Sequence, residues 1–160
     1  MAAKEELPMA LRAAYLALHR ASDAKFAPHG ITADQFVLLA TLARGGQALN
    51  QRQLAQRMPS DPSTVRAMLV LLEKSGLVER EPHPTDARAR MVKLTTNGRQ
   101  KFQRLWKAGE SIRSRMFEAL EPDEADTLVQ LLTRITESLY RESATTGAAT
   151  APLSSFKEVP

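Results

Sequence analysis

The sequence of 160 residues contains no cysteine, and this absence excludes several classes of protein. Without thiols there is no disulfide framework, zinc ribbon, thiol catalysis or cysteine-based sensing of oxidants. The three histidines, His19, His29 and His83, lie far apart in the chain and lack the spacing of metal ligands. We therefore expect neither a metal ion nor another cofactor.

The sequence also lacks a long apolar run. No stretch approaches the roughly 18 to 20 apolar residues that span a membrane, and the N-terminus has no apolar signal core. A glycine loop that could cradle a phosphate is missing, and so is a convergent set of acid, base and nucleophile. These absences favour a cytoplasmic protein that has no membrane partner and is not an enzyme.

Positive charge is concentrated in the middle of the chain. The segment Arg44 to Arg104 holds twelve Lys or Arg against five Asp or Glu, so its net charge is +7 and that of the rest is −3. Such asymmetry is typical of a basic module that meets a polyanion. A basic surface that only solvent contacts is the alternative that charge alone leaves open.

Helical periodicity flanks this basic segment on both sides. Apolar residues recur at helical spacing from Leu7 to Phe26, from Thr95 to Leu120 and from Pro122 to Leu139. These helices carry more apolar surface than one small lobe can cover, so we expect a second copy of the chain to bury it. The segment Ser143 to Pro160 has no apolar period and is interpreted as a mobile tail.

Capping residues predict two helices within the middle segment. Thr32 with Gln35, and Asn50 with Gln53, have the three-residue spacing of a capping box. In this motif each side chain accepts a hydrogen bond from the backbone N–H of the other residue. A glycine pair at positions 45 and 46 ends the first helix, and the second is expected to be short.

Another helix and two strands follow. Asp61 and Pro62 begin a helix that ends at Gly76, because the missing N–H of proline costs nothing at the first helical position. Leu77 to Glu81 and Arg90 to Leu94 are predicted to be strands, and the prolines between them predict a projecting loop. Two short helices followed by a hairpin form a winged helix-turn-helix, which suits duplex DNA because the major groove admits one helix.

We therefore predict a mainly α fold with a small β-hairpin wing. A winged helix-turn-helix lobe is expected at residues 31–95, and an N- and C-terminal helical dimerisation region at residues 7–30 and 96–140. A monomer whose terminal helices form an intramolecular cap is the alternative.

The candidate DNA-binding residues lie on the two helices of the motif and in the wing: Gln51, Arg52, Ser63, Thr64, Arg66, Asp86, Arg88 and Arg90. Hydroxyl groups can donate or accept at base edges, and an arginine can pair with guanine or grip a phosphate. In the wing, Asp86 could brace the guanidinium of Arg88 for the narrow minor groove, and Arg90 with Lys93 would contact phosphates.

Each of these residues also has a plainer interpretation. Ser63 and Thr64 could merely cap their helix, and Arg66 could be a solvated charge. Asp86 and Arg88 could form an ordinary surface ion pair.

Three segments of the sequence resemble the winged-helix regulators of the MarR family. Asp86-Ala-Arg88, five residues and Leu94-Thr95, with Asn97-Gly98 after them, match that family's wing signature. The segments 54–57 (Leu-Ala-Gln-Arg) and 71–80 (Leu-Leu-Glu-Lys-Ser-Gly-Leu-Val-Glu-Arg) are similar to the sequences on either side of its recognition helix. The resemblance covers roughly Leu7 to Tyr140.

The resemblance implies a DNA-binding transcriptional regulator, most often a repressor. It further implies a triangular homodimer with interlocked terminal helices whose two lobes meet successive major grooves of a pseudo-palindromic site. Ser63, Thr64 and Arg66 would lie on the recognition helix, and Arg88, backed by Asp86, would enter the minor groove. Because residue 87 is Ala and His83 replaces a frequent basic residue, wing binding is expected to be weaker or pH-sensitive.

Many members of this family are released from DNA by a small aromatic acid. Such a ligand needs a cation or an N–H donor beside an apolar wall, and Arg12, His19 and Trp106 are candidates by residue type. A core position for Trp106 and a surface position for His19 are the alternatives. The rival to DNA binding as a whole is a winged-helix protein adaptor without sequence-specific binding, against which the basic middle segment argues.

Overall fold

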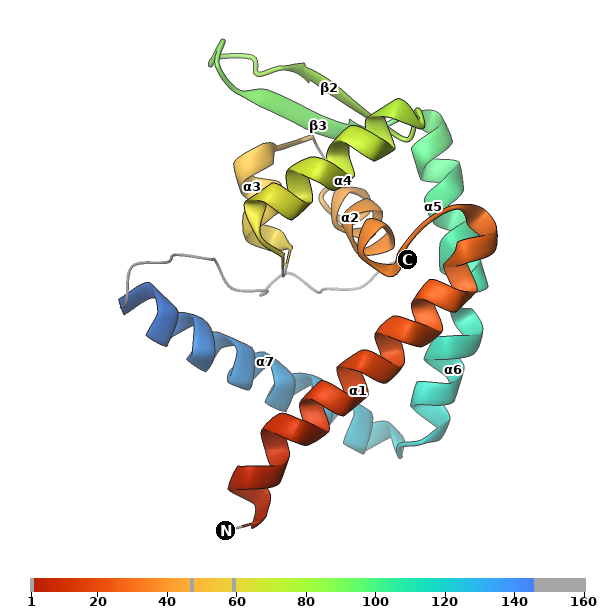
Figure 1. Ribbon diagram of the computed structural model, residues 1–160, viewed down its shortest axis with the longest axis vertical. Helices are drawn as coiled ribbons and strands as arrows, with labels where there is room; N and C mark the ends of the chain where they lie inside the picture. The colour runs from red at the N-terminus through yellow and green to blue at the C-terminus, as the bar shows by residue number, and fades with distance from the viewer. Residues whose placement is uncertain (1, 47, 59, 146–160) are drawn as a thin grey trace.

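The computed structural model describes residues 2–46, 48–58 and 60–145, which form a mainly helical molecule with a small sheet at its upper end (Figure 1). The elements in chain order are α1 (Ala2–Phe26), the 3-10 turn η1 (Ala27–His29), α2 (Ala33–Arg44), β1 (Leu49–Asn50), α3 (Gln51–Arg57), α4 (Pro62–Lys74), β2 (Val78–Pro82), β3 (Arg90–Leu94), α5 (Thr96–Ala108), α6 (Glu110–Glu118) and α7 (Pro122–Thr145). The sheet is antiparallel with the order β1-β3-β2. The predicted fold class, mainly α with a β-hairpin wing, is confirmed.

The hydrophobic core lies inside the lobe formed by α2, α3, α4, the sheet and α5 (Figure 1). Its most deeply buried side chains are Leu38, Leu39, Leu54, Val65, Leu69, Leu72, Val78, Val92 and Leu105. In β3, Val92 and Leu94 are buried while Met91 and Lys93 are half-buried, as the two-residue period of a strand requires. The core therefore fixes α4 and the wing to one rigid body.

Both capping boxes predicted from the sequence are confirmed. Thr32 Oγ1 accepts from the Gln35 backbone N–H at 3.1 Å, and Gln35 Oε1 accepts from the Thr32 N–H at 3.0 Å. The corresponding distances between Asn50 and Gln53 are 2.7 and 3.0 Å. A cap of this kind stabilises a helix by about 1 kcal/mol, which matters most for α3 because it has only seven residues.

The sheet differs from the prediction in two places. The two-residue strand β1 pairs Leu49 with Val92 and was not predicted, because two residues are too short to show a strand pattern. The first wing strand is shifted by one residue and ends at Pro82, which pairs with Arg90. Proline is tolerated there because β2 is an edge strand.

Three helix boundaries also differ from the prediction. The first helix begins at Ala2 instead of Leu7, since residues 2–6 are strong helix formers. The helix expected from Thr95 to Leu120 is divided at Gly109, where a Cβ atom would lie 3.5 Å from the Phe26 ring. The last helix continues to Thr145, so the start of the expected tail is helical; residues 146–160 lie outside the described residues.

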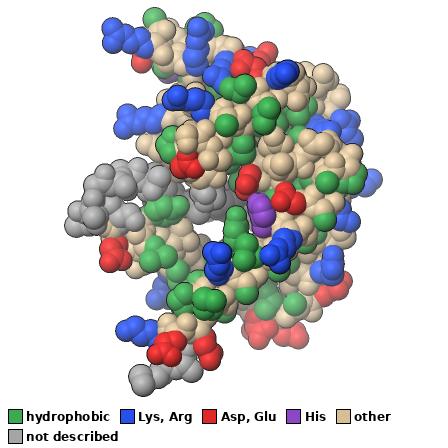
Figure 2. Space-filling view, viewed as in Figure 1, with side chains coloured by type: hydrophobic (Ala, Val, Ile, Leu, Met, Phe, Trp, Pro, Cys, Tyr) green, Lys and Arg blue, Asp and Glu red, His purple; other side chains and the backbone are tan. Residues whose placement is uncertain are grey.

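The terminal helices are poorly covered within one chain. None of the described side chains of α7, residues 122–142, is buried. In α1, among residues 3–26, Phe26 alone is buried. Large apolar side chains of α7 remain exposed: Leu128, Val129, Leu131, Leu132 and Leu139. Hydrophobic side chains gather over this lower part of the molecule in Figure 2. Within the described residues, no helix is both long and apolar enough to cross a membrane.

Candidate nucleic-acid interface

The N-terminus of α4 is organised by the carboxylate of Asp61. Its Oδ1 accepts hydrogen bonds from the backbone N–H groups of Ser63 and Thr64, both at 3.0 Å. The Ser63 hydroxyl donates to the same oxygen, and the Thr64 hydroxyl donates to Oδ2 at 2.6 Å. These hydrogen bonds, those of the two hydroxyls foremost, hold the pKa of Asp61 far below its usual range.

Ser63 and Thr64 therefore contribute to the helix cap, as the plainer interpretation of the sequence proposed. Both residues nevertheless remain exposed. Because each hydroxyl proton is directed at Asp61, the outward side of each oxygen presents lone pairs. In a DNA groove these oxygens would accept hydrogen bonds from base amino groups.

Four of the sequence-predicted residues are exposed arginines that are free to contact a partner. They come from α3, from α4 and from the wing: Arg52, Arg66, Arg88 and Arg90. Within residues 2–46, 48–58 and 60–145, their guanidinium groups form no hydrogen bond or ion pair. Figure 2 shows Lys and Arg side chains projecting at the upper left, where Figure 1 places α3 and the wing. Gln51, at the start of α3, is half-buried.

Lys93, which the sequence analysis also assigned to phosphate contact, forms ion pairs within the chain. Its ammonium lies 2.7 Å from Glu81 and 3.5 Å from Glu79, both on the neighbouring strand β2. The hydrogen bond and charge of Glu81 raise the pKa of Lys93. The sequence analysis missed these pairs because they depend on strand register.

The wing loop, residues 83–89, is closed by side-chain caps. His83 Nδ1 accepts from the backbone N–H groups of Thr85 at 3.2 Å and Asp86 at 3.1 Å. Asp86 Oδ1 accepts from the backbone N–H of Arg88 at 3.0 Å. Asp86 therefore shapes the loop and does not brace the guanidinium of Arg88, because an Asp side chain readily reaches the backbone two residues ahead.

The base of the wing is tied to the end of α4. Arg80 Nε on β2 lies 3.1 Å from Glu73 Oε2 on α4. Thr95 Oγ1 donates to the Gly76 carbonyl at 2.6 Å and accepts from the Gly98 N–H at 3.0 Å. These contacts give a physical reason for Thr95 and Gly98 in the wing signature, because they fix the wing, α4 and α5 relative to one another.

The three candidate ligand-binding residues do not meet in one place. Trp106 is half-buried and packs against the core, so its structural interpretation is supported. His19 is half-buried and lies 3.2 Å from Asp23 and 4.0 Å from Asp34, and its ring lies tilted beside that of Tyr15. Arg12 is exposed on α1. No hydrogen bond, ion pair or ring contact joins any two of the three within the described part of the chain.

Arg113 is the nearer of two cations over the Trp106 ring, the other being Arg44 at 6.0 Å, and the sequence analysis missed both. The Arg113 guanidinium lies 3.9 Å from the centre of the indole ring and donates to the Trp106 carbonyl at 2.7 Å and to Glu110 at 2.5 Å. The hydrogen bond from Arg113 lowers the pKa of Glu110. Two helical turns separate Arg113 from Trp106, so the pair could have been found only by placing both residues on one continuous helix face.

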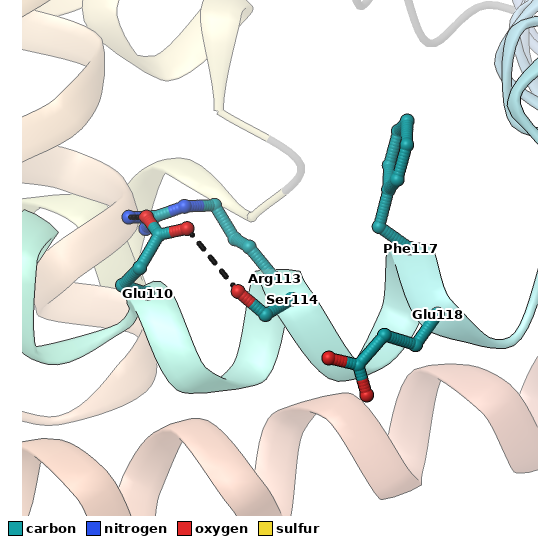
Figure 3. Close-up of a pocket in the computed structure, with 5 residues that line it drawn as sticks. All are labelled: Glu110, Arg113, Ser114, Phe117 and Glu118. Atoms are coloured by element: carbon teal, nitrogen blue, oxygen red, sulfur yellow. Dashed lines mark hydrogen bonds and ion pairs between the residues drawn. The ribbon is translucent and has the colours of Figure 1, made fainter.

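A shallow hollow of about 380 Å³ lies beside this pair on α6. It is lined by Glu110, Arg113, Ser114, Phe117 and Glu118. Figure 3 shows Arg113 and Ser114 turned toward Glu110, with the Phe117 ring about one turn further along α6. Among the described residues, no cluster of His, Asp and Glu side chains is arranged to hold a metal ion.

Comparison with known proteins places this geometry in a family. The family model described as MarR family matches residues 29–89. The multiple antibiotic resistance protein MarR of Escherichia coli is 32% identical over 109 residues, which are 68% of this chain and 75% of that protein. An uncharacterised helix-turn-helix transcriptional regulator of Bacillus subtilis is 31% identical over 115 residues, 71% of this chain and 72% of that protein.

Solved structures of MarR-family proteins have the same fold as this chain. The crystal structure of a mutant E. coli MarR complexed with operator DNA superposes with a TM-score of 0.75 at 27% identity, covering 84% of this chain and 97% of that one. The structure of an organohalide-sensing regulator with 2,4-dichlorophenol bound superposes with a TM-score of 0.82 at 19% identity, covering 98% of this chain and 90% of that one. Because the sequence identity is so low, this match shows only that the two proteins share a fold. The chain belongs to the MarR family of DNA-binding transcriptional regulators, which are not enzymes.

Proposed function

We propose that this regulator binds a pseudo-palindromic operator as a homodimer and acts as a repressor, with α4 in the major groove and the wing in the adjacent minor groove. The observation that carries the proposal is the group of four exposed arginines without partners among the described residues, on α3, α4 and the wing. An unpaired guanidinium can bind a phosphate or a guanine edge without first losing an ion pair. The E. coli relative was solved with operator DNA, which supports the same use of this fold.

The uncovered terminal helices support the homodimer. An amphipathic helix of 24 residues with no buried side chain among those described is not a stable arrangement for a lone chain in water. A second copy would bury the apolar faces of α1 and α7. A twofold dimer presents two identical lobes, and these match a site with twofold symmetry.

DNase I footprinting on the DNA around the protein's own gene tests the DNA-binding part of the proposal. We expect one protected site with two similar half-sites about 10 base pairs apart, centre to centre, or a multiple of that spacing. Arg88→Ala should weaken protection without changing the dimer. Protection that is equally weak on a scrambled duplex would instead favour the protein-adaptor function.

We further propose that a small aromatic carboxylate or phenol releases the protein from DNA. Arg113 lies over the Trp106 ring and lines a hollow together with Phe117, so a positive charge lies between two aromatic side chains, which is the chemistry that such a ligand needs. Glu110 already pairs with Arg113, so a carboxylate would have to displace it, whereas a phenol could donate to it. The ligand must bind the DNA-free arrangement of the lobes more tightly than the DNA-bound one.

Intrinsic fluorescence provides a direct test, because Trp106 is the single tryptophan of the chain. Salicylate, benzoate and 2,4-dichlorophenol would be titrated against the free protein and against its complex with DNA. We expect one compound to change the emission of Trp106 and to release the DNA, and Arg113→Met to abolish both effects. Release without any change at Trp106 would place the ligand elsewhere, and no release by any compound would contradict the ligand class.

A further inference from the structure

The outward face of α4 is apolar at its centre. Ser63, Ala67, Val70 and Lys74 follow one another at helical spacing on the side opposite the buried stripe of Val65, Met68, Leu69 and Leu72. Val70 is 53% exposed, and its neighbour Leu71 on the edge of the same face is 54% exposed, whereas the four residues of the buried stripe face the core. The helix therefore presents a methyl-rich surface between a polar first turn and a basic last turn.

Among the residues that the structure describes, no other element buries this surface. The other side of α4 packs into the core of the lobe. Helices α1 and α7, which carry large exposed apolar side chains, lie toward the opposite end of the molecule (Figure 1). Arg66 flanks the stripe on one side and Lys74 lies at its end; both are exposed. Cations around an apolar centre are complementary to a polyanion that carries an apolar group in its groove.

Duplex DNA has one such group on the edges of its bases in the major groove, the 5-methyl of thymine. We propose that Ala67 and Val70 recognise thymine methyl groups, so that each operator half-site carries thymine opposite the second turn of α4. This inference rests on the proposed function and names what the recognition helix reads.

Replacing thymine by deoxyuridine in the footprinted operator tests the proposal, because the exchange deletes the methyl group and leaves the hydrogen-bonding edge unchanged. We expect one or two of these single exchanges per half-site to weaken binding of the full-length protein about three- to fivefold, as measured by fluorescence anisotropy. Val70→Ala removes the contact in both half-sites of a dimer, so it should weaken binding to the thymine operator by about the square of that factor, roughly 10- to 25-fold. It should no longer distinguish thymine from deoxyuridine at that position.

Val37→Ala provides the matched control, since Val37 is 38% exposed on α2 and lies outside α3, α4 and the wing. It should bind as the wild type does and retain the preference for thymine. Because Val70 is exposed, its truncation should leave the melting temperature unchanged, which separates recognition from folding.

Two results would overturn the inference in distinguishable ways. If Val70→Ala kept the full preference for thymine while selective binding persisted, Val70 would not read the methyl group and the proposed function would stand. If the wild type showed no selective binding to any duplex, the proposed function and this inference would fail together.

Discussion

At Gly98 the first turn of α5 lies directly against the backbone of Leu77. A Cβ atom at this position would come within 1.9 Å of the Leu77 carbonyl oxygen, and no side-chain rearrangement relieves a clash with backbone. We expect Gly98→Ala to lower the free energy of unfolding by about 3 kcal/mol, as overpacking of a rigid site does. Urea unfolding measures this, and Asn97→Ala, which changes an exposed neighbour, should remain within about 0.5 kcal/mol of the wild type.

Asp61 contributes stability that depends on pH. Its pKa in the folded protein lies far below the value of about 3.9 expected in the unfolded chain, so the contribution is complete above pH 4 and is lost as the pH falls toward the folded pKa. Asp61→Ala should therefore lower the melting temperature at pH 7, and the difference from wild type should narrow below pH 4. A difference that stays constant from pH 7 to pH 3 would contradict this account.

The wing loop is held in shape partly by the side chain of His83. His83 Nδ1 accepts from two backbone N–H groups of the loop that carries Arg88. His83→Ala should loosen that loop and weaken DNA binding severalfold, because Arg88 would have to be ordered on binding. His83→Asn should recover much of the affinity, since an Asn side chain also accepts from backbone N–H groups shortly after it. Equal affinities of wild type and His83→Ala would show that the loop cap is dispensable.

Contacts between residues that are close in the sequence could be predicted, whereas contacts between residues far apart in the sequence could not. The capping box of Thr32 and Gln35 was predicted because its partners are three residues apart and need only a local helix start. The hydrogen bond from Thr95 to the Gly76 carbonyl spans nineteen residues, and the pairing of Leu49 with Val92 depends on the tertiary fold. Neither leaves a local pattern. Asp86 was assigned the wrong partner because sequence spacing does not distinguish a guanidinium from the backbone N–H beside it.

The exposed apolar face of α7 predicts that the whole molecule is a dimer. Leu132→Glu would place a charge on that face in both copies, and burying it without a partner is costly. We expect the dissociation constant of the dimer to rise at least about a hundredfold, as measured by sedimentation velocity. Gln130→Glu adds the same charge on the opposite face of α7 and should leave the dimer intact. A Leu132→Glu protein that stayed dimeric would place the interface elsewhere.

The salt dependence of operator binding tests the central claim most directly. Each phosphate that a cation neutralises lowers the logarithm of the binding constant by about 0.9 for every tenfold increase in salt. We predict a steep negative slope for the wild type, and for Arg88→Ala a slope smaller by about 2, since a dimer contributes two such arginines. Arg104→Ala, which removes an exposed arginine of α5 outside the wing, should keep the wild-type slope. A wild-type slope near zero, or the same slope for Arg88→Ala, would contradict the account.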